Sequence, residues 1–336
     1  MTLSILLLLT VSVSIFQYLY KYEAKGELDD GTSSESRVKD FGAWIPSESY
    51  LERMHGDRQV NAINSILSQG FNEYYFVMRN FNNTTETNST EALLKLADTT
   101  NLKIIIILLP LAEGGTHVSY DWKGWMMYFN SLKEKHSSFL GFAIDDFNAV
   151  VDIRRIYLMN NMDLMGLSYF SSALSYKKDD VQFFPVMYLE TSGFETLKKE
   201  YNKYIESVIL VSTLYQNVSY LENNFANISK MLDNKPIKFI VYPNTGKFYL
   251  SSDRLITATL SIASRWADGI IIFRNINHPI VQNYLHNHND PQYMNAIGEI
   301  EKLQLKYEII ESRRDIGMCT FCLYEKTEIA LINMPK

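Results

Sequence analysis

Short apolar segments recur along the chain about every 25 to 40 residues, and polar residues bound most of them. Most segments are rich in Ile, Val, Phe or Tyr, which is typical of strands that are buried on both faces of a parallel sheet. They span residues 41–46, 73–79, 103–110, 139–145, 181–190, 207–213, 237–243 and 268–274.

Helical patterns separate these segments. Examples cover residues 90–101, 122–136, 194–205, 219–234 and 254–267, and a last helical pattern covers 294–312. Strand and helix thus alternate eight times, which predicts an α/β fold, a (β/α)8 TIM barrel, in a single domain over residues 41–312. The alternative is an open, doubly wound sheet. That fold usually has fewer repeats and often a Gly-rich phosphate loop after its first strand, where this chain has FGAWIPSESY.

The two ends of the chain differ from the barrel pattern. Residues 3–20 are almost uninterruptedly apolar, which predicts a signal peptide or a membrane anchor within residues 1–20. A buried core helix is the alternative. Residues 21–40 are polar and charged and are interpreted as a linker. Residues 313–336 form a C-terminal extension that the pattern does not place.

Further features favour export to a secreted or cell-surface location, with membrane contact only through the N-terminal segment. Five asparagines begin an N-x-[ST] glycosylation signal: Asn82, Asn83, Asn88, Asn217 and Asn227. The two cysteines, Cys319 and Cys322, are predicted to form a local disulfide, with two free thiols as the alternative. The net charge of −6 and the lack of a long basic run argue against nucleic-acid binding.

In this barrel fold, catalytic residues lie where strands end and the following loops begin. The strand ends of this chain carry aromatic, carboxylate and amide side chains, which suit a carbohydrate ligand. No metal triad, G-x-S-x-G motif or phosphate loop occurs among them, so we predict neither a metal nor a cofactor. His286 and His288 form H-x-H, but within a polar segment that is interpreted as a solvated loop.

The fourth segment, FLGFAIDDFN, is the most informative. Alternation places Gly141, Ala143 and Asp145 on one face of the strand, and Asp146 follows at the strand's edge. Two neighbouring carboxyl groups cannot both ionise cheaply, so one holds a proton that it can donate. The alternative interpretation is a strand-ending turn, or an aspartate that caps the next helix.

A fourth strand that ends in a hydrophobic residue followed by Asp-Asp-Phe resembles the O-GlcNAcase/hyaluronidase-type glycoside hydrolases. The resemblance implies that Asp145 orients the 2-acetamido group of the substrate and that Asp146 is the general acid. Tyr242-Pro-Asn244 is faintly similar to a segment with a sugar-binding Asn in that family. The strand end is also similar, more weakly, to the spherulin-4-like polysaccharide hydrolases, whose fourth strand ends in Asp-Glu.

Many retaining barrel glycosidases place a nucleophile after strand seven. Here no carboxylate follows that strand before Asp253, so Glu190 is the best second carboxylate, although LETSGFETL also fits a helix start. We therefore predict an exported glycosidase-like protein that acts on glycans, in particular N-acetylhexosamine-containing ones under the resemblance. The alternative is a catalytically inactive TIM barrel that binds glycan or a partner at the cell surface. The predicted catalytic residues are Asp145, Asp146 and Glu190, and the predicted substrate-binding residues are Trp44, Arg79, Asn148, Tyr188, Tyr242, Asn244 and Arg274.

Overall fold

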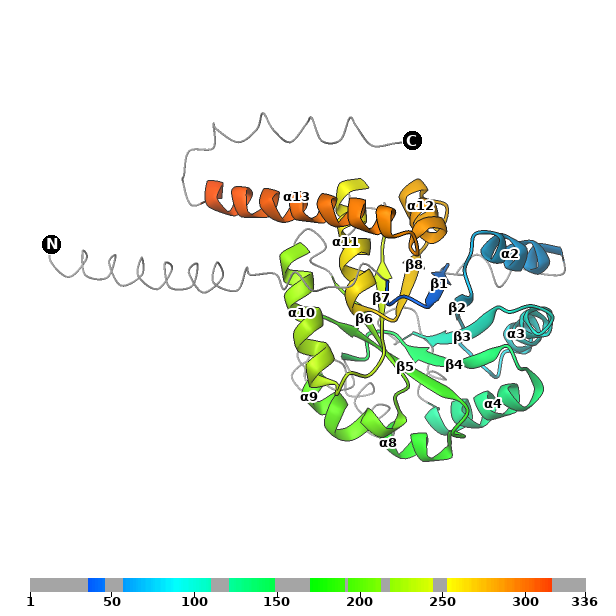
Figure 1. The fold of residues 1–336 in the computed structure, drawn as a ribbon. Helices are drawn as coiled ribbons and strands as arrows, with labels where there is room; N and C mark the ends of the chain where they lie inside the picture. Colours follow the sequence, from blue (N-terminus) through cyan, green and yellow to red (C-terminus); the bar gives the residue numbers. More distant parts are fainter. Residues whose placement is uncertain are drawn as a thin grey trace, which may run out of the picture. The chain divides into compact units, whose positions relative to one another are not determined.

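The computed structural model describes residues 36–45, 57–109, 121–148, 170–190, 193–212, 218–243 and 253–315. Eight parallel strands pair in sequence order, and β1 also pairs with β8, so the sheet is a closed barrel (Figure 1). The predicted TIM barrel is confirmed. The strands are β1 (Asp40–Trp44), β2 (Glu73–Val77), β3 (Lys103–Leu108), β4 (Phe139–Ile144), β5 (Gln182–Tyr188), β6 (Val208–Val211), β7 (Ile237–Val241) and β8 (Gly269–Phe273).

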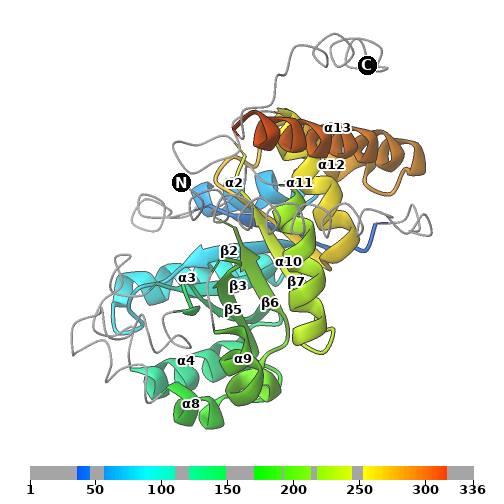
Figure 2. The same ribbon diagram turned by 90° about the vertical axis from the view of Figure 1, so that its left-hand side faces the viewer.

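Helices lie around the barrel in both ribbon views (Figures 1 and 2). The α-helices are α2 (Asp57–Ser68), α3 (Thr84–Ala97), α4 (Trp122–Lys135), α8 (Phe170–Ala173), α9 (Phe194–Thr196), α10 (Val218–Met231), α11 (Asp253–Trp266), α12 (Pro279–Asn287) and α13 (Pro291–Asp315), and a short 3₁₀ helix covers Leu174–Tyr176.

Helices α2, α8 and α12 were not among the predicted helices, and two of the predicted ones differ most from the structure. Helix α3 begins at Thr84 instead of residue 90, because the Asn83 side chain caps it by accepting from the Thr85 N–H at 2.9 Å. The helix predicted over 194–205 is α9 followed by a π-helical stretch, Leu197–Tyr201, and a 3₁₀ turn, Asn202–Tyr204.

The predicted alternation along β4 holds at Phe142 and Ala143, whereas Leu140 departs from it and packs against the interior cluster, beside a register shift in the pairing with β3. Ala143 belongs to the cluster of side chains that fills the barrel, whereas Phe142 packs outward, 4.7 Å from the ring of Phe129 on α4. Small residues make room for large ones inside the barrel. A Cβ on Gly42 of β1 would lie 2.5 Å from the ring of Tyr75, which is fully buried in the same cluster.

A buried ionic group closes the amino end of the barrel. Lys238 of β7 contacts the Glu73 carboxylate, lies 3.3 Å from Asp40, and sits over the Phe184 ring. The Tyr75 hydroxyl donates to Glu73 at 2.7 Å. Burial raises the pKa of Glu73, although the charge of Lys238 opposes that change. The group therefore ties β1, β2 and β7 together below the inward aromatic side chains.

Helix α13 packs across α10 and α11 (Figure 2). Arg265 of α11 donates to both carboxylate oxygens of Glu301 at 2.6 Å and to Glu222 of α10 at 2.9 Å. Glu308 of α13 accepts from the first two backbone N–H groups of α10, at 2.7 and 3.2 Å. Two strand-and-helix repeats are thus held together by the last helix.

Several predictions fall outside the described residues: the N-terminal segment, Asn217, Asn244, Cys319 and Cys322. Within the described ranges, no helix is both long enough and apolar enough to cross a bilayer. The prediction of a signal peptide or anchor therefore stays a prediction.

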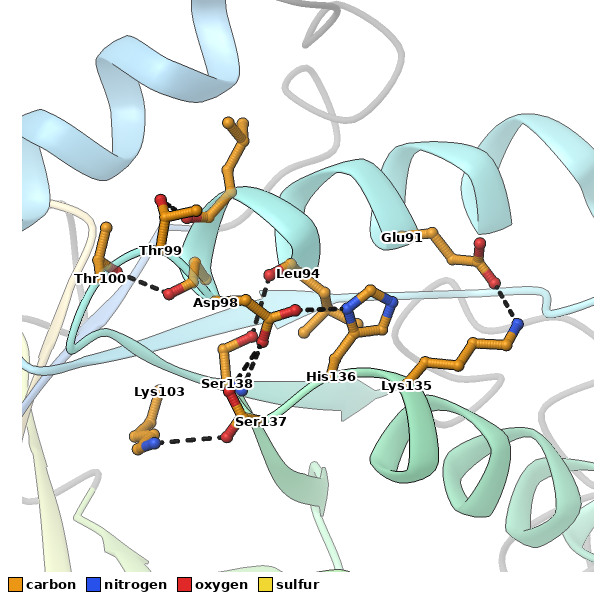
Figure 3. Close-up of polar contacts among 12 residues, drawn as sticks. Glu91, Leu94, Asp98, Thr99, Thr100, Lys103, Lys135, His136, Ser137 and Ser138 are labelled. Carbon is orange, nitrogen blue, oxygen red and sulfur yellow. Dashed lines mark hydrogen bonds and ion pairs between the residues drawn. The ribbon is translucent and has the colours of Figure 1, made fainter.

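A second polar network joins two helix-to-strand connections at the amino end of the barrel (Figure 3). Nδ1 of His136 lies 2.7 Å from the Asp98 carboxylate, which also accepts from the Ser138 backbone N–H at 2.8 Å. Partial burial acts to raise the pKa of Asp98, but the hydrogen bonds with His136 and Ser138 outweigh it. The pKa of this carboxyl therefore falls below its ordinary value.

We expect Asp98→Asn to lower the free energy of unfolding by about 1–2 kcal/mol at neutral pH, because hydrogen bonds to a charged acceptor are lost. Since the folded-state pKa of Asp98 is depressed, its stabilisation is present above the unfolded-state pKa, about 3.9. It is lost as the pH falls through the folded-state value. Urea titrations between pH 7 and pH 3 should show the wild-type advantage shrinking at acid pH.

The matched control is Glu91→Gln, which removes an exposed carboxylate that pairs with Lys135 at 3.0 Å in the same region. This substitution should change the free energy of unfolding by no more than about 0.5 kcal/mol. An equal loss of unfolding free energy in both variants would show that the Asp98 network contributes no more to stability than an exposed ion pair does.

Candidate active site at the carboxyl end of the barrel

Asp145 follows β4 and continues its inward face. Its backbone N–H donates to the Leu108 carbonyl at 3.0 Å, which extends the pairing with β3 by one residue. The side chain is 9% exposed, and its Oδ1 accepts from the Asp146 N–H at 2.9 Å. Asp145 is therefore positioned by the barrel itself at the rim where catalytic groups of this fold lie.

Asp146 occupies a left-handed turn, with φ of 44°. Non-glycine residues seldom adopt this backbone, although Asp does so more readily than most. The next backbone N–H, of Phe147, donates to the Val186 carbonyl of β5 at 2.9 Å. Hydrogen bonds thus fix the backbone on both sides of the turn. The partly exposed Asp146 side chain therefore projects from a fixed backbone position.

Phe147 anchors this turn. It is fully buried, with ring centroids 5.4 Å from Phe183, 5.5 Å from Phe170 and 5.3 Å from Tyr201 of the π-helical stretch. No role for Phe147 was predicted from the sequence. Its ring partners lie in β5 and in helical segments distant in sequence, so the local pattern gave no signal for this role.

The ends of β4, β5 and β6 are joined by side chains predicted for the site. Asn148 is fully buried, and its Oδ1 accepts from the Tyr188 backbone N–H at 2.6 Å. Glu190 accepts from the Ser212 hydroxyl at 2.5 Å. Burial raises the pKa of Tyr220, and the charge of Glu190 adds to that rise. The three predicted carboxylates therefore follow the ends of two adjacent strands, β4 and β5.

The opposite side of the rim carries an aromatic and cationic group, made of Trp44, Tyr242, Phe273 and Arg274. The Phe273 ring lies 5.3 Å from Trp44, edge to face, and 4.7 Å from Tyr242. The Arg274 guanidinium lies 5.0 Å from the Phe273 centroid. Phe273 contacts all three of these predicted residues, and no role was predicted for it from the sequence.

Arg79 follows β2. Its backbone N–H and that of Asn80 donate to the Glu86 carboxylate, at 2.9 and 3.0 Å, so the first turn of α3 holds this loop. The sequon residues Asn82, Asn83, Asn88 and Asn227 are all exposed. Exposure satisfies one requirement for glycosylation, and their modification stays a prediction.

The histidine pair lies on a helix and not in a loop as predicted. His286 is in the last turn of α12 and His288 caps its end, and each Nδ1 lies within hydrogen-bond distance of a carbonyl of the same helix, Gln282 and Leu285. Within the described ranges, no group of three or more His, Cys, Asp or Glu side chains is arranged to hold a metal ion.

Comparisons with known proteins place the chain by its fold alone. No family model matches the sequence, and no curated protein matches it. Similar solved structures include glycoside hydrolases. An α-amylase from Geobacillus thermoleovorans, complexed with acarbose, is 10% identical with a TM-score of 0.46, over 78% of this chain and 80% of that one.

An endo-1,4-β-xylanase from Caldicellulosiruptor owensensis is 10% identical, with a TM-score of 0.44 over 70% of this chain and 85% of that one. A sialic acid aldolase from Ruminococcus gnavus is 12% identical, with a TM-score of 0.47 over 82% and 80%. At these scores the likenesses carry no argument about activity. The chain is a (β/α)8 barrel, and its function has to be argued from its own side chains.

The left-handed backbone of Asp146 can be tested without a substrate. We expect Asp146→Gly to keep or raise the free energy of unfolding, because glycine adopts this conformation without a steric penalty. Asp146→Val should be about 1–2 kcal/mol less stable than the glycine variant, because its side chain clashes there. Chemical denaturation of the three proteins measures the difference. Equal stability of the Gly and Val variants would contradict the turn.

Proposed function

We propose that the protein is a glycosidase that cleaves glycans by acid catalysis from the Asp145–Asp146 pair. One observation carries the proposal: Asp145 continues the inward face of β4 at the catalytic rim, and Asp146 follows it in a turn fixed by backbone hydrogen bonds and by buried Phe147. Such a turn on a rigid scaffold supplies the positional precision that general acid catalysis requires.

The two carboxyl groups take different roles in this proposal. Asp146, which is partly exposed, acts as the general acid and donates a proton to the leaving oxygen as the glycosidic bond breaks. Asp145 orients the 2-acetamido group that the resemblance implies for the substrate. The oxygen of that group attacks the anomeric carbon as the bond to the leaving oxygen breaks, and water then hydrolyses the cyclic intermediate. Glu190, on the adjacent strand, is the second carboxylate. Its bond with Ser212 fixes the position of its carboxyl group.

The remaining predicted residues form the binding surface in this proposal. Trp44, Tyr188 and Tyr242 lie at or beside the inward aromatic cluster and offer ring faces for sugar stacking. Asn148 acts through Tyr188, whose backbone it holds. Arg79 and Asn244 supply polar contacts from the loops after β2 and β7. No cofactor enters the scheme.

We expect Asp146→Asn to lower turnover by roughly a hundredfold or more, which is the contribution of a general acid. Initial rates on aryl N-acetylhexosaminides and on a panel of polysaccharides measure it. The control is Asp180→Asn, the same chemical change at an exposed residue near the start of β5, and it should leave the rate unchanged. Full activity of Asp146→Asn would remove the proposed acid. Glycan binding without any turnover would support the inactive binder instead.

We also propose that the protein is exported and glycosylated. The support is the apolar segment 3–20 together with four exposed sequon asparagines. When the full chain is expressed in a eukaryotic secretory host, it should reach the secretory pathway and lose mass on enzymatic removal of N-glycans. Replacing Asn82, Asn83, Asn88 and Asn227 by Gln should shrink that loss. Retention in the cytosol with no change in mass would contradict export.

A further inference from the structure

Arg274 lies in a strained turn directly after β8. Its φ is 67°, and the Asn275 N–H donates to the Phe273 carbonyl at 2.9 Å, which closes a three-residue turn around it. With a positive φ this is the rare and strained form of such a turn. Glycine would occupy it without strain. A long side chain held in such a conformation is a feature that concentrates at functional sites.

The turn also decides where the side chain lies. Ile271 and Phe273 point into the barrel, so a continued extended backbone would direct residue 274 outward. The Arg274 guanidinium lies instead over the inward Phe273 ring, and its backbone N–H is held by the Trp44 carbonyl at 2.9 Å. The exposed cation therefore sits at the inner rim of the barrel.

Within the described ranges, no carboxylate forms an ion pair with the Arg274 guanidinium. Two other arginines are paired with carboxylates. Arg265 is clamped by Glu301, and Arg37 pairs with Asp268 at 3.3 Å. Asp253, which begins α11, lies 3.7 Å from His278 instead. Arg274 thus retains its planar set of donors for a ligand.

A second unsatisfied donor belongs to the same group. The Nε1–H of Trp44 is buried and has no hydrogen-bond acceptor within the described ranges, and the residue is 3% exposed. Buried donors without partners are rare in native structures and require an explanation. Two donors therefore lie against Phe273: the exposed Arg274 guanidinium, and the buried Trp44 N–H, which lacks an acceptor within the described ranges.

We propose that Arg274, stacked on Phe273 and backed by Trp44, binds an oxyanion carried by the glycan. A planar guanidinium matches a carboxylate or sulfate through two parallel hydrogen bonds. The ligand is then an acidic glycan, with a uronic carboxylate or a sulfate ester, and the glycan part of this inference rests on the proposed function. The carboxylates of β4 and β5 repel such a group, so it is directed to the β8 side.

Matched pairs of probes test the charge alone. Trigalacturonate is compared with its methyl ester, and a sulfated carrageenan neotetraose with its desulfated form, by isothermal titration at low salt. The full chain is used as wild type and as Asp146→Asn, which suppresses turnover during the titration. We expect one acidic member to bind at least tenfold more tightly than its neutral partner, and the pair that shows the effect identifies the oxyanion.

Arg274→Met should abolish that preference, and Arg274→Lys, which keeps the charge without the planar fork, should give an intermediate value. Arg37→Met removes the same charge at the amino end of the barrel and should retain the preference. Arg274→Gly should unfold no more easily than wild type, which separates loss of binding from loss of folding. A preference that persists in Arg274→Met, or its absence in wild type, overturns the proposal.

The outcomes also separate this inference from the proposed catalysis. Cleavage of neutral glycans with no preference for acidic ones leaves the Asp146 mechanism standing and removes the Arg274 assignment. Arg274-dependent binding of an acidic probe without cleavage of any glycan supports the oxyanion site and contradicts the enzyme. Failure of every probe to bind or react overturns both.

Discussion

Pairing between β1 and β8 is the constraint on which the rest of the structure depends. Five residue pairs join these strands, from Asp40 with Gly269 to Trp44 with Phe273, and they convert an open sheet into a closed barrel. Closure brings all strand ends of one polarity to a single rim and forces alternate side chains into one interior. That interior accepts the bulk of Tyr75 only because Gly42 has no side chain. The same pairing sets Trp44 beside Phe273 and so creates half of the candidate site.

The two ends of the barrel use charge in different ways. At the amino end, Lys238, Glu73 and Asp40 satisfy one another below the aromatic interior, and Asp98 with His136 joins two connections on the same side. At the carboxyl end, Asp146 and Arg274 extend from left-handed turns at strand ends four positions apart in the eight-stranded ring. Paired charges stabilise a fold, whereas charges held at strained positions are typical of sites that act on ligands.

The turns of Asp146 and Arg274 lie across the barrel mouth from each other, so the rim has an acidic side and a basic side. Carboxylates lie on β4 and β5, and the cation and most of the aromatic faces lie on β7, β8 and β1. Under the proposed function, a ligand that spans the mouth would meet an acidic side and a basic side, and this would orient it. The architecture by itself does not assign an activity, because barrels of this kind serve many reactions. The particular side chains at the two turns carry the functional argument.

The sequence alone determined the fold class and the strands. Apolar segments rich in β-branched and aromatic residues place strands reliably when helices separate them, and alternation in FLGFAIDDFN put Ala143 and Phe142 on opposite faces, as they are in the structure. It also located the strand ends, from which the candidate residues of the rim were chosen. Only the tertiary structure revealed the left-handed backbones of Asp146 and Arg274, the anchoring of Phe147 and the linking role of Phe273. Those features arise from contacts between strands that are distant in sequence, and local pattern contains no information about such contacts.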